Sequence, residues 1–365
     1  MIAALALLIW LWLVFAPVRF WESTPELTPA QPSDAPDVDI IIPARDEAET
    51  IAPVIASLLA QDYPGHFRLI LVDDNSTDNT ATLAGHATGL TIITGAAKPS
   101  GWSGKLWALA QGVAASEAPL ILFTDADITH DPRHLATLVA RLQAPRVDMV
   151  SEMVRLNCVS WAERFLIPAF VYFFQMLYPF ASVNDPLNPR AAAAGGTILL
   201  RREALARSGG LARIKHALID DVSLAREIKA RGPIFLGHSG LAVSIRKYPH
   251  IADIWNMITR TAFTQLNYNP LLLAATIIGL ALVWLVAPYE VAFGHGLGFI
   301  FGLGASILAI LSYFPTLARY RLSRAYALTL PFIALFYMAA TIASAFGHWR
   351  GQGAKWKHRA YGNPA

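Results

Sequence analysis

Cysteine and charged residues are scarce in this sequence. Cys158 is the only cysteine, which excludes an intramolecular disulfide and any zinc or iron–sulfur site built on cysteines. Only 15% of the 365 residues are charged, against roughly 25% in a soluble globular domain. The net charge of +3 comes from short basic clusters beside apolar runs, which is typical of membrane anchors rather than of nucleic-acid-binding proteins. We therefore expect no nucleic-acid partner.

Long apolar runs are present instead, and they predict several membrane helices. Residues 2–18 carry no charge, and a run of about this length spans a bilayer, so we expect a membrane anchor over residues 1–20. A cleaved signal peptide is disfavoured because no basic segment precedes the run. Three further runs of spanning length lie at 271–288, 293–314 and 327–346. They predict a helical membrane domain over 269–346, four membrane helices in total, and a basic C-terminal tail over 347–365.

The orientation of these helices follows only in part from the charges. If residues 38–268 face the cytoplasm, the loop with Arg319, Arg321 and Arg324 returns to the same side, as the positive-inside rule requires. The basic tail would then lie on the far side, against that rule, so one run is not a full span. We expect a multi-pass protein of the cell inner membrane with residues 38–268 in the cytoplasm.

Two other segments connect these parts. Residues 21–37 are rich in Pro, Ser, Thr and acidic residues, which predicts a linker. Residues 161–183 are strongly apolar but are interrupted by Pro168 and Pro179. We expect an interfacial helix there, because Trp, Tyr and Phe favour the headgroup boundary, and a buried core helix is the alternative.

Residues 38–268 alternate short β-branched runs with amphipathic segments. The runs VDIIIPA, FRLILVDD, LTIITG and APLILFTDAD predict strands, and the segments between them predict helices. This alternation indicates an α/β domain with a parallel sheet and helices on both faces. In such sheets the chemistry collects at the carboxyl ends of the strands, where the acidic residues of this sequence fall.

Three acidic sites follow predicted strands or precede a predicted helix. Asp73 and Asp74 end one strand, where a carboxylate can bind the base or ribose of a nucleoside or cap the next helix. Asp125 and Asp127 are two residues apart in extended chain, so both can reach one Mg²⁺ or Mn²⁺. Asp220 and Asp221 precede an amphipathic segment, where they can supply a general base or a helix cap.

Four segments occur in order on this α/β pattern: IIPARDEAETI, VDDNSTDNT, DAD and IDDVSLAREIKARG. Together they resemble the motifs of the family 2 glycosyltransferases. The resemblance covers residues 38–268 and implies a GT-A fold, a Rossmann-like nucleotide-sugar-binding domain. The segments KPSGWSGKLWALAQG (98–112) and GAKWKHRAYG (353–362) are similar to those of members that act on lipids. These are the ceramide glucosyltransferases, the carotenoid glycosyltransferases and above all the hopanoid-associated glycosyltransferases.

The resemblance implies a role for each matching residue. Those implied to contact the nucleotide or its diphosphate are Pro43, Ala44, Glu47, Asp73, Asp74, Lys105 and Asp125. Asp125 and Asp127 would also form the metal motif, with Asp127 closer to the cation. Asp221 matches the Asp of the family's Glu-Asp pair and is the implied base, with Asp220 in the Glu position. Gly195 and Gly196 would line the acceptor side.

One departure from the family pattern bears on the product. Processive members carry a Gln-x-x-Arg-Trp motif, whereas Arg260 stands here between Met257 in the Gln position and Thr261 in the Trp position. Arg260 can still neutralise diphosphate charge or pair with lipid phosphate. The expected activity is transfer of one sugar from a UDP-sugar to a lipid hydroxyl, with inversion and with Mg²⁺ or Mn²⁺, in hopanoid-related lipid synthesis. The alternatives are transfer to a polyprenyl phosphate, or lipid binding without catalysis.

Overall fold

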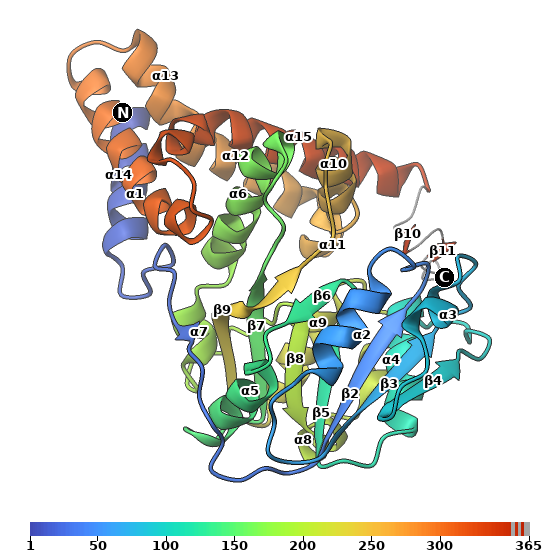
Figure 1. The fold of residues 1–365 in the computed structure, drawn as a ribbon. Coiled ribbons are helices and arrows are strands. Elements are labelled where there is room, and N and C mark those ends of the chain that lie inside the picture. The colour runs from blue at the N-terminus through green and yellow to red at the C-terminus, as the bar shows by residue number, and fades with distance from the viewer. Residues whose placement is uncertain (352–354, 357–358, 361–365) are drawn as a thin grey trace. The chain divides into compact units, whose positions relative to one another are not determined.

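The computed structural model describes residues 1–351 together with the backbone at 355–356 and 359–360. The described chain forms two compact units. One is helical and contains residues 1–23, 158–181 and 248–351; the other contains residues 24–157 and 182–247 and is built on a sheet (Figure 1). The boundaries of these units differ from those of the predicted domains. Residues 24–37 belong to the sheet unit, and residues 158–181 and 248–268 belong to the helical unit.

The helical unit carries the apolar runs. Its helices are α1 (Ile2–Phe15), α6 (Trp161–Leu177), α10 (Ile251–Thr259), α11 (Ala262–Gln265), α12 (Pro270–Trp284), α13 (Val286–Phe293), α14 (Leu297–Arg319), η2 (Arg324–Thr329) and α15 (Leu330–Trp349). Among the described residues, three helical segments are long and apolar enough to cross a membrane: Pro270–Phe293, Leu297–Arg319 and Arg324–Trp349.

Three of the four predicted membrane helices therefore have spanning length within the described residues, and the N-terminal one, α1, is shorter. Helix α1 has 14 residues, which rise about 21 Å, whereas the hydrocarbon core of a bilayer is about 30 Å thick. It still packs inside the helical unit: Trp10 Nε1 donates to the Val283 carbonyl at 2.8 Å, and its ring meets that of Trp284 edge to face.

Helix α6 is the predicted interfacial segment, and it packs deeply within the helical unit. Its start is fixed by a capping box, in which Ser160 accepts from Glu163 N while Glu163 accepts from Ser160 N. Further along, Tyr172 is fully buried and its hydroxyl lies 2.6 Å from Ser312 Oγ on α14. These contacts are those of a buried helix, the alternative that the sequence left open, while binding of this segment to a membrane surface stays a prediction.

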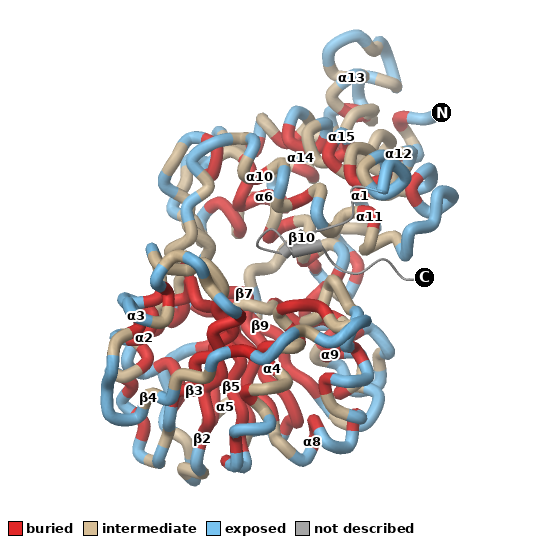
Figure 2. Tube along the Cα trace, turned by 90° about the vertical axis from the view of Figure 1, so that its right-hand side faces the viewer, coloured by how far each residue is buried: buried red, intermediate tan, exposed pale blue. Residues whose placement is uncertain are grey.

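The second unit is built on a nine-stranded sheet, counted over the described residues, in the order β1-β9-β7-β8-β5-β2-β3-β4, with β6 also paired to β9. Its strands are β1 (Glu26–Leu27), β2 (Val38–Ala44), β3 (Phe67–Asp73), β4 (Leu90–Thr94), β5 (Leu120–Thr124), β6 (Ile128–His130), β7 (Met149–Arg155), β8 (Thr197–Arg201) and β9 (Ile234–Ser244). The four strands predicted from β-branched runs are β2, β3, β4 and β5. Figure 2 shows that this sheet is the most buried part of the unit.

The sheet is mixed rather than parallel. Strands β5, β2, β3 and β4 are parallel neighbours, as predicted, but β8 is antiparallel to both β5 and β7, and β6 is antiparallel to β9. The parallel pairing predicted from the alternating segments is confirmed for these four strands. Strand β8 runs the other way because the chain between β7 and β8 leaves and returns at the same end of the sheet. A strand reached in that way runs back along its neighbour, whereas a parallel one needs a crossover.

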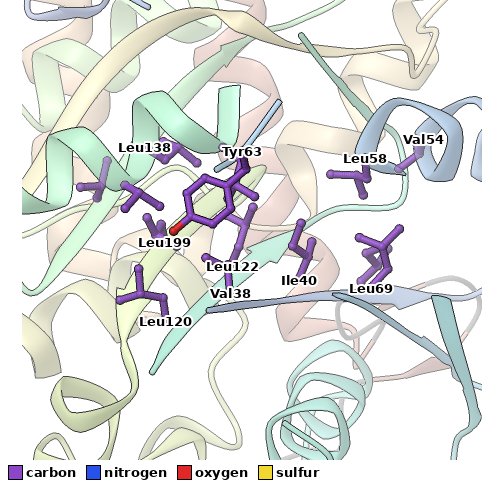
Figure 3. Close-up of a cluster of buried hydrophobic side chains, with 14 of the residues drawn as sticks. Val38, Ile40, Val54, Leu58, Tyr63, Leu69, Leu120, Leu122, Leu138 and Leu199 are labelled. Atoms are coloured by element: carbon purple, nitrogen blue, oxygen red, sulfur yellow. The ribbon is translucent and has the colours of Figure 1, made fainter. Parts of the chain in front are cut away.

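Helices cover the sheet and complete its core. They are α2 (Ile51–Leu59), α3 (Thr80–Ala84), α4 (Gly104–Ala114), α5 (His134–Gln143), α8 (Arg202–Arg207), η1 (Leu211–Ile214) and α9 (Asp220–Lys229), while α7 (Phe180–Asn184) lies at the boundary of the two units. Figure 3 shows Leu58 and Leu138 from two of these helices beside Ile40 and Leu122 from the strands. Gly112 lets α4 lie against β2, because a Cβ there would overlap the Ile41 side chain.

The predicted linker is ordered against the sheet unit over much of its length. Within it, β1 pairs in parallel with His238 and Ser239 of β9. Ser33 N donates to Gln143 Oε1 at 2.9 Å, and Gln143 Nε2 donates to the Asp34 carbonyl at 2.7 Å, which ties the segment to α5. At the other end of the chain, β10 (Lys355–Trp356) and β11 (Arg359–Ala360) are antiparallel. The rest of the predicted basic tail beyond residue 351 lies outside the described residues.

Candidate functional site

Six of the predicted site residues line one pocket of the sheet unit. They are Pro43, Lys105, Asp125, Gly195, Asp220 and Asp221. Pro43 is near the end of β2 and Asp125 directly follows β5, while Lys105 and both Asp220 and Asp221 lie in the first turns of α4 and α9. The carboxyl ends of β2 and β5 therefore supply Pro43 and Asp125, and the starts of α4 and α9 bring Lys105, Asp220 and Asp221 to the same pocket.

Lys105 is the positive centre of this pocket. Its Nζ lies 2.8 Å from Asp125 Oδ1 and 3.4 Å from Asp220 Oδ2. Burial disfavours its charged form, but the two carboxylates outweigh burial and raise the pKa of Lys105, so the side chain is an ammonium at neutral pH. Ser103 caps the same helix by accepting from Leu106 N at 3.3 Å, which fixes where Lys105 leaves the backbone.

Asp221 lies in the first turn of α9 and has a strongly perturbed pKa. Burial and the negative charge of Asp220 raise its pKa to about 7, against the opposing charge of Lys105. The residue that caps this helix is Ile219, which provides no side-chain cap. The two aspartates therefore do not act as the N-cap that the sequence left as an alternative, although Asp221 Oδ1 accepts from Val222 N at 2.7 Å. A carboxylate with a pKa near 7 suits a general base.

Gly195 leaves room for the Asp221 carboxylate. A Cβ at position 195 would lie 3.1 Å from Asp221 Oδ2, closer than an unstrained contact allows, so we expect Gly195→Ala to displace Asp221. A displacement of about 1 Å can cost 100-fold in rate, and we expect kcat to fall on the order of 10-fold. Gly240→Ala is the matched control, because its Cβ would meet only Glu26 Oε1 at 3.9 Å. Equal kcat values for the two variants would contradict this account.

Asp127, the other predicted metal ligand, is held by an arginine. Arg246 follows β9, and its Nε pairs with Asp127 Oδ2 while its Nη2 lies 2.6 Å from Glu47 Oε1. The backbone reinforces this contact, because Ile245 N donates to the Asp127 carbonyl at 2.8 Å. Arg246 thereby joins the predicted metal motif to Glu47, a residue predicted to lie beside the nucleotide. Arg246 was not among the predicted site residues, because its only signal in the sequence is a basic pair after an apolar run.

The donor set suits a divalent cation that is completed by a substrate. Among the described residues, no group of three His, Cys, Asp or Glu side chains is placed to hold a metal ion. Mg²⁺ is usually held by only one or two carboxylates together with substrate phosphates and water. Burial and the charge of Asp127 raise the pKa of Asp125, while Lys105 opposes this rise, so added positive charge at these two carboxylates is favourable.

The predicted nucleotide side is also formed by strand ends. Asp74 is fully buried, its N donates to the Ala44 carbonyl at 2.8 Å, and its Oδ2 lies 3.6 Å from Arg45 Nη1. The Asp73 carboxylate accepts from Ser76 N and from the Ser76 hydroxyl. Asp73 thus stabilises its own turn but does not cap the next helix, α3, whose N-cap is Asn79. Contact of Asp73 or Asp74 with uridine stays a prediction.

The two remaining predicted residues fall in different places. The Gly196 carbonyl accepts from Asp125 N at 3.2 Å, so this residue supports the metal motif. Arg260 follows α10 in the helical unit, whereas the cation that contacts Asp127 is Arg246. Contact of Arg260 with a diphosphate and of Gly196 with an acceptor remain predictions.

Comparisons with known proteins identify the sheet unit. The model of the family "Glycosyl transferase family 2" matches residues 39–209, just under half of the chain. An uncharacterized glycosyltransferase of Mycobacterium bovis is 32% identical over 105 residues, which are 29% of this chain and 43% of that protein. The 4,4'-diaponeurosporenoate glycosyltransferase of Staphylococcus aureus is 38% identical over 91 residues, 25% of this chain and 24% of that protein. The chain thus matches less than half of the length of these relatives.

Among solved structures, a mannosyltransferase of Pyrobaculum calidifontis in complex with GDP-mannose and Mn²⁺ has a similar fold. The TM-score is 0.56 with 21% sequence identity, and the match covers 95% of both chains. At this identity the likeness concerns the fold alone. Residues 39–209, which include the strands that form the pocket, match the glycosyltransferase family 2 model and lie on a mixed α/β sheet of the GT-A fold.

Proposed function

We propose that this protein transfers one sugar from a UDP-sugar to the hydroxyl of a lipid, inverting the anomeric carbon, in the synthesis of a hopanoid-related glycolipid. The observation that carries this proposal is the pocket in which Asp221 faces Gly195 and lies close to the Lys105–Asp125 ion pair. It combines a base of suitable pKa with positive charge for a diphosphate, which are the two requirements of glycosyl transfer.

Asp221 acts as the general base in this proposal. Its carboxylate takes the proton of the acceptor hydroxyl, and the oxygen attacks the anomeric carbon from the face opposite the diphosphate. The bond between that carbon and the diphosphate oxygen breaks, and the nucleoside diphosphate leaves with the bonding electron pair. A pKa of about 7 keeps a large share of Asp221 ionised at neutral pH while leaving it basic enough to accept the proton.

Lys105 and Arg246 supply positive charge on the donor side. Lys105 is an ammonium in the first turn of α4, a position at which the helix dipole also favours an anion. Asp125 and Asp127 would hold a divalent cation, which when bound neutralises charge on the leaving diphosphate. The carboxylates of Asp73 and Asp74 would accept hydrogen bonds from the nucleoside.

The lipid acceptor and the inner membrane belong to the same proposal. Three described helical segments are long and apolar enough to keep the enzyme in a bilayer, where a lipid hydroxyl is available without a soluble carrier. The match to a carotenoid glycosyltransferase supports an apolar acceptor. We propose that the sheet unit faces the cytoplasm, where nucleotide sugars are made.

The experiment that tests this function is a panel of radiolabelled donors. Purified full-length protein in detergent receives UDP-glucose, UDP-N-acetylglucosamine, UDP-glucuronate or GDP-mannose, with Mn²⁺ or Mg²⁺ and with hopanoid, sphingolipid or polyprenyl phosphate. GDP-mannose is included because the structurally similar mannosyltransferase was solved with it. Label from a UDP-sugar in a hopanoid is the expected result. If only GDP-mannose gives labelled lipid, the assignment of a UDP-sugar as donor is wrong. If label enters only polyprenyl phosphate, the assignment of a lipid hydroxyl as acceptor is wrong.

A further inference from the structure

A chain of buried polar side chains runs from the strand end beside Asp125 into the core of the sheet unit. Thr124 is the last residue of β5, His130 ends β6, His134 begins α5, and Glu152 lies on β7. None is more than 5% exposed. Buried polar groups of this kind are expensive unless they are paired, and neither the proposed base nor the cation motif uses them.

The contacts form a continuous series. Thr124 Oγ1 lies 3.1 Å from the Gly196 carbonyl and 3.1 Å from His130 Nε2, and His130 Nδ1 lies 3.0 Å from His134 Nδ1. His134 Nε2 contacts Glu152 Oε1. The Gly196 carbonyl also accepts from Asp125 N. The series therefore ends at a carbonyl that is shared with the metal motif.

The direction of these hydrogen bonds follows from counting protons. A carbonyl only accepts, so the single hydroxyl hydrogen of Thr124 points to Gly196, and Thr124 must accept from His130 Nε2–H. Burial and the neighbouring His134 lower the pKa of His130 well below its usual value, so this ring is neutral and has one N–H. His130 Nδ1 then accepts from His134 Nδ1–H, and one proton lies between His134 Nε2 and Glu152.

We propose that Glu152, His134, His130 and Thr124 form a one-way hydrogen-bond chain that positions Asp125 and Gly195–Gly196 for glycosyl transfer. The hydroxyl of Thr124, His130 Nε2–H and His134 Nδ1–H all point toward the Gly196 carbonyl, which holds β8 and the turn after β5 together. Gly195 in turn packs against Asp221. These four are positioning residues, because they act through the pocket groups, and their role rests on the proposed function.

Two opposing threonines provide a matched test. Thr124 and Thr197 face each other across β5 and β8, and both are buried. Thr197 Oγ1 has no hydrogen-bond partner within the described residues. Thr124→Val and Thr197→Val each replace a hydroxyl with a methyl of similar size, but only the first interrupts the chain. Mutation of the groups that support metal ligands typically lowers metal affinity or activity about 10- to 100-fold. We therefore expect Thr124→Val to lower kcat by that factor and Thr197→Val to leave kcat unchanged. Thr124→Ser retains the hydroxyl and should restore most of the rate.

A second measurement separates this proposal from the proposed function. In full-length protein labelled with [¹⁵N]histidine, NMR should show His130 as the neutral Nε2–H tautomer, assigned by loss of its signals in His130→Gln. Thr124→Val should shift these signals and Thr197→Val should not. An Nδ1–H tautomer, or equal kcat values in the two valine variants, would overturn the hydrogen-bond chain. If the tautomer is as expected but no donor is used, the proposed function fails instead.

Discussion

Replacing Asp221 with asparagine is expected to lower kcat about 10²- to 10⁴-fold, the usual contribution of a general base. The variant keeps the size of the side chain and its contact with Val222 N, but it cannot take a proton from an acceptor hydroxyl. Binding of UDP should be unchanged, because in our proposal Asp221 faces the acceptor rather than the nucleotide. Single-turnover rates and isothermal titration with UDP in the presence of Mn²⁺ measure the two effects separately.

A matched control for this variant is Asp62→Asn. Asp62 is an exposed carboxylate that does not line the pocket, so its replacement should change neither quantity. Undiminished turnover in Asp221→Asn would remove Asp221 from the role of base. A loss of UDP binding equal to the loss of rate would instead place Asp221 on the donor side.

Replacing Lys105 with methionine is expected to change both the affinity for the donor and the pH dependence. A hydrogen bond to a charged group contributes about 1.5–3 kcal/mol, so loss of a contact with the diphosphate should raise KM for the donor about 10- to 100-fold. Lys105 also lowers the pKa of Asp221, which is about 7 with the ammonium present. Removing that charge raises the pKa of Asp221 further.

The direction of the pH effect follows from the role of the base. Asp221 must be ionised to accept a proton, so kcat/KM rises with pH through the pKa of the free enzyme. In a plot of kcat/KM against pH, we expect the acidic limb near pH 7 for the wild-type protein and at higher pH for Lys105→Met. Lys105→Arg retains the charge and should leave the limb in place. Lys98→Met, from the same loop but bonded to the Trp102 carbonyl at 2.9 Å, should behave as wild type. A limb that does not move in Lys105→Met would contradict the electrostatic link between the two residues.

The strands that carry the pocket could be predicted because their signals are local. Each of β2, β3, β4 and β5 is a short run of aliphatic residues, and β2 begins and ends at the predicted residues, Val38 and Ala44. Once parallel pairing is expected, geometry alone brings Asp125 and Pro43 to one edge. The pocket also contains Gly195, Asp220 and Asp221, which lie just before β8 and at the start of α9 and do not follow from the parallel pairing.

The features that the sequence did not predict depend on pairings between distant residues. Arg246 and Glu47 are 199 positions apart, and nothing near either residue indicates the other. His130 and His134 lack the sequence spacing of zinc ligands, and nothing near them in the sequence indicates that both are buried. Strand β8 is antiparallel because the chain between β7 and β8 returns to the end of the sheet at which it left. A local sequence pattern does not indicate to which end a chain returns. Strand β1 has only two residues, too few to show an alternation.

The pairing of β1 with β9 also bears on how the catalytic part of this protein can be separated from its membrane helices. Strand β9 has 11 residues, nearly all buried, and β1 covers its outer side at His238 and Ser239. An uncovered hydrophobic strand edge promotes aggregation. A fragment that starts at Val38, where the predicted domain begins, would expose this edge and tend to precipitate. A fragment for crystallisation therefore has to keep the segment from Thr24 onward, which the composition alone would have classified as dispensable.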